Sequence, residues 1–127
     1  MKELSDCVGH VVSNDEEKVC SAGSQIRKKY GITRLYVTRS EKGITSLDDM
    51  GICTCKSAAR NVYDVSGAGD TVVAVVAAAS ADHIDIHSIL SLANIAASIA
   101  VSKVGTYQVG RKELITAIEE RSQENEL

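Results

Sequence analysis

The first strong pattern of apolar and polar positions along the chain is a helical one. Val19, Ala22 and Ile26 recur at helical spacing within residues 15–30, with acidic residues early in the segment and basic residues late. This charge distribution suits the helix dipole, so the segment predicts an amphipathic helix. Gly31 follows directly, at a position where a left-handed glycine commonly ends a helix.

Short β-rich segments come next. "TRLYVT" at residues 33–38 predicts a buried strand, and "GITSL" at 43–47 and "ICTCKS" at 52–57 flank the turn-like "DDMG". The last three segments together indicate a β-hairpin. We expect the strand at 33–38 to run parallel to a neighbour before the chain enters this antiparallel hairpin, so that the sheet is small and mixed.

The second half of the chain is predicted to be helical. Residues 69–81 form an apolar helix, residues 85–104 a second helix, and "RKELITAIEER" from Arg111 a third. The apolar stripe of the second helix consists of Ile86, Ile89, Leu90, Ala93, Ala96 or Ala97, and Ala100. Residues 119–127 are polar and are expected to form a tail that frays.

Helices alternating with a few strands predict an α/β layered fold. Three or four strands make a thin sheet for a complete α/β enzyme, so we expect the 127 residues to be part of a larger fold. Aromatic residues make up only 3% of the chain, with no Phe and no Trp. The core is therefore expected to consist of Val, Ile, Leu and Ala, which suit close packing of helices on a sheet.

Charge and apolar content exclude several classes of function. The net charge is −3 with both signs interspersed, which argues against a nucleic-acid partner. No apolar run reaches membrane-spanning length and no signal peptide is evident, so a cytoplasmic protein without membrane partners is expected. "CTC" at residues 53–55 could bind metal, but no second Cys or His pair completes a site, and ordinary buried thiols explain the four cysteines.

The chemistry of the chain is expected in the loop "SGAGD", residues 66–70. It opens an apolar helix, and the first turn of a helix has unpaired N–H groups and a partial positive charge. Small residues let an anion, above all a phosphate, approach those amides closely. Asp70 would repel a bound phosphate, and its presence suits a site that also accepts a proton from a hydroxyl attacking phosphorus.

A purely structural interpretation of the loop stands beside this one. Asp70 in a first helical turn is favourable through the dipole alone, and Gly-x-Gly before a helix can be a tight turn. Asp64 favours the functional interpretation, because a second acid at the loop provides a place for a cation. Other phosphate loops fit worse: the chain has no G-x-x-x-x-G-K-[ST] run, and "GAGDTV" lacks the third glycine of a dinucleotide fingerprint.

The segment "DVSGAGDT" and the small-residue helix after it resemble the C-terminal signature of the ribokinase-like (PfkB) carbohydrate kinases. "VTRSEKG" is similar to that family's T-x-G-x-x-G nucleotide loop, and "LANIAASIAVSKVGT" to its last nucleotide-contacting helix and loop. Within the family, "VYDVSGAGDTVVAVVAAA" looks most like the heptose-7-phosphate kinase domains of ADP-heptose synthases. The resemblance covers about residues 5–118.

This resemblance implies the fold and the function. The fold would be the C-terminal part of a three-layer α/β/α ribokinase-like domain, with residues 1–118 in the nucleotide-binding part and 119–127 as the polar tail. The activity would be phosphorylation of a sugar hydroxyl by ATP with Mg²⁺, the acceptor being heptose 7-phosphate. The resemblance implies that the N-terminal half of the family's fold, with the sugar site, lies outside this sequence.

The resemblance also assigns roles to individual residues. Asp70 would be the base, and the amides of Gly67, Ala68 and Gly69 would form the anion hole. Asp64 and Ser66 stand where some members bind a monovalent cation such as K⁺. The nucleotide contacts would come from Thr38 and Gly43 at the phosphates, Asn94 near the adenine, and Lys103, Val104 and Gly105 in the loop that closes the pocket.

Ordinary structural interpretations remain open for several of these residues. Asn94 can satisfy local backbone groups, Lys103 suits a helix C-terminus, and Thr38 suits a strand. His83 and His87 are expected to face water. Ser40 replaces the first glycine of the family loop, and a positive φ there would be unfavourable for a serine.

Two other functions remain open. The chain could belong to a different sugar or nucleoside kinase of the family, or it could be a non-catalytic nucleotide-binding or assembly module. A thin sheet with an open edge would also favour a homodimer.

Overall fold

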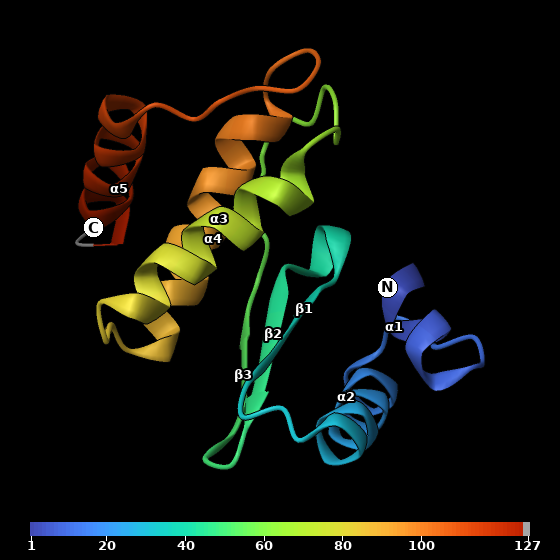
Figure 1. Cartoon of the computed structure of the whole chain (residues 1–127). Helices are drawn as coiled ribbons and strands as arrows, with labels where there is room; N and C mark the ends of the chain where they lie inside the picture. Colours follow the sequence, from blue (N-terminus) through green and yellow to red (C-terminus); the bar gives the residue numbers. More distant parts are fainter. Residues whose placement is uncertain (126–127) are drawn as a thin grey trace. The chain divides into compact units, whose positions relative to one another are not determined.

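A computed structural model of the chain describes residues 1–125 (Figure 1). The chain divides into two compact units, Met1–Lys56 and Ser57–Leu127, and each is described by itself. No helix among the described residues combines the length and the apolar character needed to cross a membrane.

The first unit begins with two helices, α1 (Lys2–Val8) and α2 (Glu16–Tyr30). The predicted helix at 15–30 is confirmed as α2, and its caps explain its bounds. The Asp15 carboxylate accepts a hydrogen bond from the Lys18 amide at 2.9 Å, and Gly31 ends the helix with φ 63°. Helix α1 was not predicted, because it is short and buries only Leu4.

A three-stranded sheet completes this unit. Strands β1 (Leu35–Thr38), β2 (Ile44–Asp48) and β3 (Gly51–Cys55) lie in this order, and both pairings are antiparallel. The predicted hairpin is confirmed, but the mixed sheet is wrong for the described strands. The connection from β1 to β2 is only residues 39–43, whereas a parallel crossover needs a dozen or more residues.

Helix α2 packs against β1 and β2, and Gly23 makes the close approach. A Cβ atom at this glycine would lie 3.1 Å from the methyl groups of Leu47 on β2.

The core of the unit is aliphatic as predicted and consists of Leu4, Val12, Val19, Ala22, Ile26, Val37 and Leu47. Only Val37 of the four β1 residues is buried, so the expected buried strand is buried on one face alone.

In the second unit, the described residues form helices α3 (Ala68–Ala81), α4 (Ile86–Val101) and α5 (Arg111–Asn125). Helices α3 and α4 lie side by side (Figure 1). The predicted stripe on α4 is largely confirmed, since Ile89, Leu90, Ala93, Ala96 and Ala100 are buried.

The helix ends differ from the prediction at two places. Helix α4 stops at Val101 rather than Val104, because the amides of Ser102 and Lys103 bond the carbonyls of Ile99 and Ala100 in a tightened last turn. Helix α5 runs to Asn125 and so includes most of the expected polar tail. The domain boundary at residue 118 stays a prediction.

The cysteines and the exposed histidines behave much as expected. No disulfide joins the four cysteines, all of which lie among the described residues; Cys7 is exposed and the other three are only partly buried, so the expectation of buried thiols is wrong. Burial raises the pKa of the Cys20 thiol. His83 and His87 are both exposed, as predicted.

Candidate functional site

The glycine loop leads into α3 through a left-handed residue. Gly67 is the N-cap of α3, with φ 77° and ψ 0°. Its carbonyl accepts hydrogen bonds from the amide of Thr71 at 3.0 Å and from the Thr71 hydroxyl at 3.1 Å. The bond from the Thr71 amide is therefore the first hydrogen bond of the α-helical pattern. The N–H groups of the residues before Thr71 have no acceptor within the helix.

Two of the three predicted anion-hole amides are available. The N–H groups of Gly67 and Gly69 have no hydrogen-bond partner among residues 1–125. No heavy atom outside the immediate neighbourhood lies within 4 Å of a Cβ position at Gly69, so an anion can approach it. The Ala68 amide differs, because it donates to the Val65 carbonyl at 3.2 Å and is therefore satisfied within the chain.

Asp70 lies in the first turn of α3 and is exposed. Its carboxylate makes no hydrogen bond or ion pair with the part of the chain that the structure describes. It is thus open to an incoming group, on the same helical turn as the unpaired amides. This is the geometry that a base beside an anion site requires.

Asp64 joins the glycine loop to the loop that follows α4. Its Oδ1 accepts the Ser66 amide at 2.9 Å, and its Oδ2 accepts the Gly105 amide at 3.0 Å. Hydrogen bonds from Ser66, and then the one from Gly105, hold the pKa of this carboxyl below its usual range. Two segments that are distant in the sequence therefore meet at one carboxylate.

Further contacts bring the same two loops together. The amides of Tyr63 and Asp64 donate to the Val101 carbonyl at 2.8 and 3.2 Å. A Cβ atom at Gly67 would lie 3.1 Å from the Cγ2 methyl of Thr106. The glycine loop and residues 103–106 thus form one continuous surface at the start of α3.

The predicted nucleotide contacts in this unit differ in exposure. Val104 is 86% exposed, and Lys103 is exposed with its ammonium 5.4 Å from the centre of the Tyr107 ring. Gly105 is partly buried by its bond to Asp64. Asn94 is only 5% exposed on the packed face of α4, so its side chain presents little surface to a ligand.

The other two predicted contacts, Thr38 and Gly43, belong to the first unit. They flank the turn between β1 and β2, where Thr38 pairs with Ile44 and Gly43 has φ 87°. Ser40 in this turn has φ 54°, so the serine does adopt the left-handed conformation considered from the sequence. Thr38 is exposed and Gly43 is buried.

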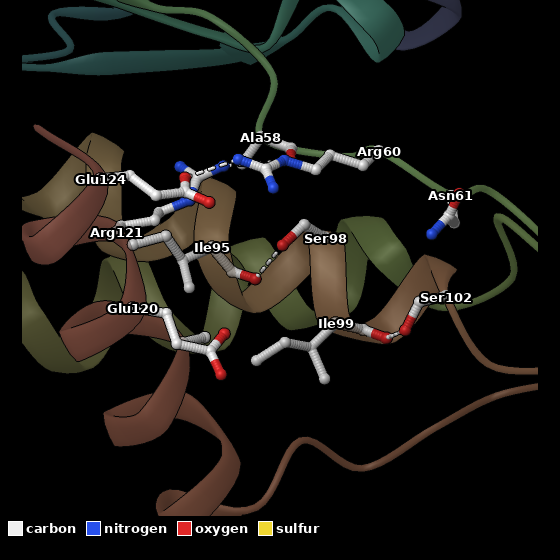
Figure 2. Close-up of a pocket in the computed structure, with 11 residues that line it drawn as sticks. Ala58, Arg60, Asn61, Ile95, Ser98, Ile99, Ser102, Glu120, Arg121 and Glu124 are labelled. Atoms are coloured by element: carbon white, nitrogen blue, oxygen red, sulfur yellow. Dashed lines mark hydrogen bonds and ion pairs between the residues drawn. The ribbon is translucent and has the colours of Figure 1, made fainter. Parts of the chain in front are cut away.

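The second unit contains a cavity of about 240 Å³ that was not predicted from the sequence. Figure 2 shows it between the segment at residues 58–61, helix α4 and helix α5. Arg121 donates to the Ala58 carbonyl at 3.0 Å, and Arg60 pairs with Glu124. The spacing of Glu120 and Glu124 on one side of α5 was the available signal, but the pairing of Glu124 with Arg60 depends on the fold.

The residues that could contact metal ions are few. Within residues 1–125, no group of three or more His, Cys, Asp or Glu side chains is placed to hold a metal. The carboxylate of Asp64 and the hydroxyl of Ser66 are oxygen groups on neighbouring residues of this loop, and they fit a weakly held monovalent cation.

Comparison with known proteins identifies the family. The family described as "pfkB family carbohydrate kinase" matches residues 1–112. The chain belongs to the pfkB family of carbohydrate kinases.

Bifunctional protein HldE of Methylobacillus flagellatus is 46% identical over 105 residues, which are 83% of this chain and 22% of that protein. HldE of Paramagnetospirillum magneticum is 43% identical over 118 residues, 92% of this chain and 24% of that one. The chain thus spans about a quarter of these relatives.

Solved structures of sugar kinases share the fold. Phosphofructokinase-2 from Escherichia coli in complex with potassium matches with a TM-score of 0.83 at 20% identity, over 96% of this chain and 39% of that one. Ribokinase of Arabidopsis thaliana complexed with ribose and ATP matches with a TM-score of 0.83 at 25% identity, over 93% and 38%. The predicted class, a partial ribokinase-like α/β fold, is confirmed.

Proposed function

We propose that this chain is the nucleotide-site part of a kinase that transfers the γ-phosphoryl group of ATP to a sugar hydroxyl. The observation that carries the proposal is the exposed Asp70 carboxylate on the same helical turn as the unpaired amides of Gly67 and Gly69. Membership of the pfkB family and the likeness to sugar kinases support the same reaction class. The cytoplasm, where ATP is abundant, is the proposed location.

Asp70 acts on the acceptor in this reaction. Its carboxylate accepts the proton of the sugar hydroxyl as that oxygen forms its bond to the γ-phosphorus and the bond to ADP breaks. The transition state of phosphoryl transfer is loose, so orienting the hydroxyl matters more than base strength. The unpaired amides of Gly67 and Gly69, with the positive end of α3, stabilise the charge on the transferred group.

The remaining assignments concern the nucleotide. We propose that Thr38 and Gly43 contact the ATP phosphates. The adenine ring would lie against the loop formed by Lys103, Val104 and Gly105, and Asn94 would support this loop from within α4. Magnesium bound with ATP supplies charge neutralisation at the phosphates. Asp64 holds the two loops in register and, with Ser66, contributes oxygens to a K⁺ ion.

We propose heptose 7-phosphate as the acceptor and heptose 1,7-bisphosphate as the product, on the way to ADP-heptose and lipopolysaccharide precursors. The support is the similarity of "VYDVSGAGDTVVAVVAAA" to heptose-7-phosphate kinase domains, together with the HldE relatives. The sugar would be bound by a part of the fold outside these residues, since the chain spans only about a quarter of those relatives.

A chimaera tests the transfer function. This chain replaces the matching segment of HldE from Methylobacillus flagellatus, and transfer of phosphate from ATP to heptose 7-phosphate is measured. Fructose 6-phosphate and ribose are offered as competing acceptors. The proposal is supported if the chimaera transfers phosphate to the heptose and the Asp70→Asn chimaera does not. A folded chimaera that binds ATP without transferring phosphate supports the non-catalytic module instead.

We also propose that the chain forms a homodimer. The outer edges of β1 and β3 are not paired with a further strand among the described residues, and open edges favour pairing with another chain. Analytical ultracentrifugation tests this, with a species of twice the mass expected at micromolar concentration. A single monomeric species up to millimolar concentration would contradict it.

A further inference from the structure

A buried guanidinium lies next to the proposed phosphate-contacting turn. Arg39 directly follows β1, and its side chain is 2% exposed. It donates hydrogen bonds to the Glu16 carboxylate at 2.8 Å, to the Thr45 hydroxyl at 3.0 Å and to the Asn14 side-chain oxygen at 2.9 Å. A charged group this deeply buried is costly unless it is fully paired, so a specific role is expected for it.

The surrounding contacts connect the turn to the start of α2. The Asn14 side-chain amide donates back to the Arg39 carbonyl at 3.0 Å, and the Lys42 ammonium donates to the Asn14 carbonyl. Both ends of the turn at residues 39–42 are therefore bonded to the same segment. The second oxygen of Glu16 accepts the Thr54 hydroxyl at 2.9 Å, which fixes the carboxylate from the other side.

The turn itself has an unfavourable backbone. Ser40 has φ 54°, a conformation that side chains other than that of glycine avoid, and Gly43 has φ 87°. The Arg39 amide donates to the Gly43 carbonyl at 2.7 Å, and the Gly43 amide donates to the Ser40 carbonyl at 3.0 Å. These short-range bonds shape the turn, but they do not remove the strain at Ser40.

We propose that Arg39 is a positioning residue for the nucleotide loop: its bonds to Asn14, Glu16 and Thr45 hold the turn at residues 38–43 in the strained conformation that presents Thr38 and Gly43 to the ATP phosphates. This inference rests on the proposed function, in which this turn is the part of the chain that contacts the ATP phosphates. The serine at position 40 makes the arginine necessary, because a glycine there would adopt the same backbone without strain.

The test is a rescue experiment on the chain. Arg39→Lys removes the planar group that bonds three partners at once, and a lysine cannot replace that geometry. We expect this variant to bind MgATP at least about tenfold more weakly by calorimetry. Hydrogen exchange at the amides of Arg39 and Gly43 should accelerate. Ser40→Gly in the Arg39→Lys background should restore most of the affinity.

A matched control separates positioning from general stability. Arg34 forms a 2.8 Å ion pair with Asp48 at the far end of the sheet from the turn, so Arg34→Lys should leave MgATP affinity and turn exchange unchanged. If Arg39→Lys does not fold, Glu16→Gln serves as a second variant, with a weaker effect of the same direction. Circular dichroism establishes folding in each case.

The outcomes are distinct. Unchanged turn exchange and affinity in Arg39→Lys, or a loss that Ser40→Gly does not restore, would overturn the positioning role. If the unmodified chain does not bind MgATP, the proposed function fails for the isolated chain. The exchange measurement still decides the positioning role, since faster exchange that Ser40→Gly reverses supports it and unchanged exchange refutes it.

Discussion

Substituting Gly67 by alanine tests the backbone on which the anion site depends. Gly67 combines a left-handed conformation, φ 77°, with a close approach to Thr106. An alanine at this position must either adopt the unfavourable φ or reshape the entrance to α3. Both responses change the direction of the neighbouring amides.

The free energy of unfolding should fall by about 1 kcal/mol in Gly67→Ala. A left-handed alanine costs roughly 1–2 kcal/mol, and the reduced freedom of the unfolded chain offsets roughly 0.4–1 kcal/mol of that. The new methyl would lie 3.1 Å from the Thr106 Cγ2. Thr106 is exposed and its side chain can rotate away, so this contact adds only a few tenths of a kcal/mol, about the cost of a slightly strained rotamer.

Urea unfolding followed by circular dichroism measures the effect. Gly69→Ala is the matched control: Gly69 has no positive φ, and no atom lies near its Cβ position, so stability should be unchanged or slightly raised. Thr106→Ser, which removes the Cγ2 methyl, should recover only a small part of the loss in Gly67→Ala. A Gly67→Ala chain as stable as the unmodified one, or full recovery by Thr106→Ser, would refute the reasoning about the backbone.

Three other predictions follow from the same structure. Asp70→Asn in the chimaera should reduce phosphoryl transfer by about 10²–10⁴ while MgATP affinity, measured by calorimetry, stays within about threefold, since a general base contributes a factor of this size. Leu90→Ala should lower the free energy of unfolding by about 2–5 kcal/mol in urea, because Leu90 is fully buried between packed helices. The Glu16 carboxyl has its pKa lowered, chiefly by the hydrogen bond from Arg39 and then by that from Thr54. A lowered pKa stabilises the fold above the ordinary value of about 4.3 and loses this effect as pH falls through the lowered value. The stability difference between the unmodified chain and Glu16→Gln should therefore be present at pH 7, begin to decrease below the ordinary value of about 4.3, and vanish once the pH has fallen through the lowered pKa.

Local signals in the sequence were sufficient for helices α2 to α5 and the hairpin, but not for α1. Asp15 and Gly31 delimit α2 through their own side-chain and backbone preferences, so the helix could be predicted without knowledge of its neighbours. The direction of β1 could not, because the spacing of apolar residues does not encode which strand is its partner. Once β2 is the partner, the connection of residues 39–43 is too short for a parallel crossover, so the pair must be antiparallel.

The sequence was sufficient to predict which residues form the candidate site. It was not sufficient to predict the contacts between residues that are distant in the chain. The exposure of Asp70 follows from its place in a polar first turn. The bond between Asp64 and Gly105 joins residues 41 positions apart and depends on how α3 and α4 pack. The Arg39 network likewise connects residues up to 25 positions apart, so its role became visible only in the folded chain.

The most direct test of the central claim is an amide NMR titration of the ¹⁵N-labelled chain with MgATP. The claim is that unpaired amides at the start of α3 bind the phosphoryl group beside Asp70. Saturable shifts are expected at the Gly67 and Gly69 amides, and they should be larger than the shift at Ala68, whose amide is already bonded to the Val65 carbonyl. Saturation by MgATP with no change at Gly67 and Gly69 would contradict it.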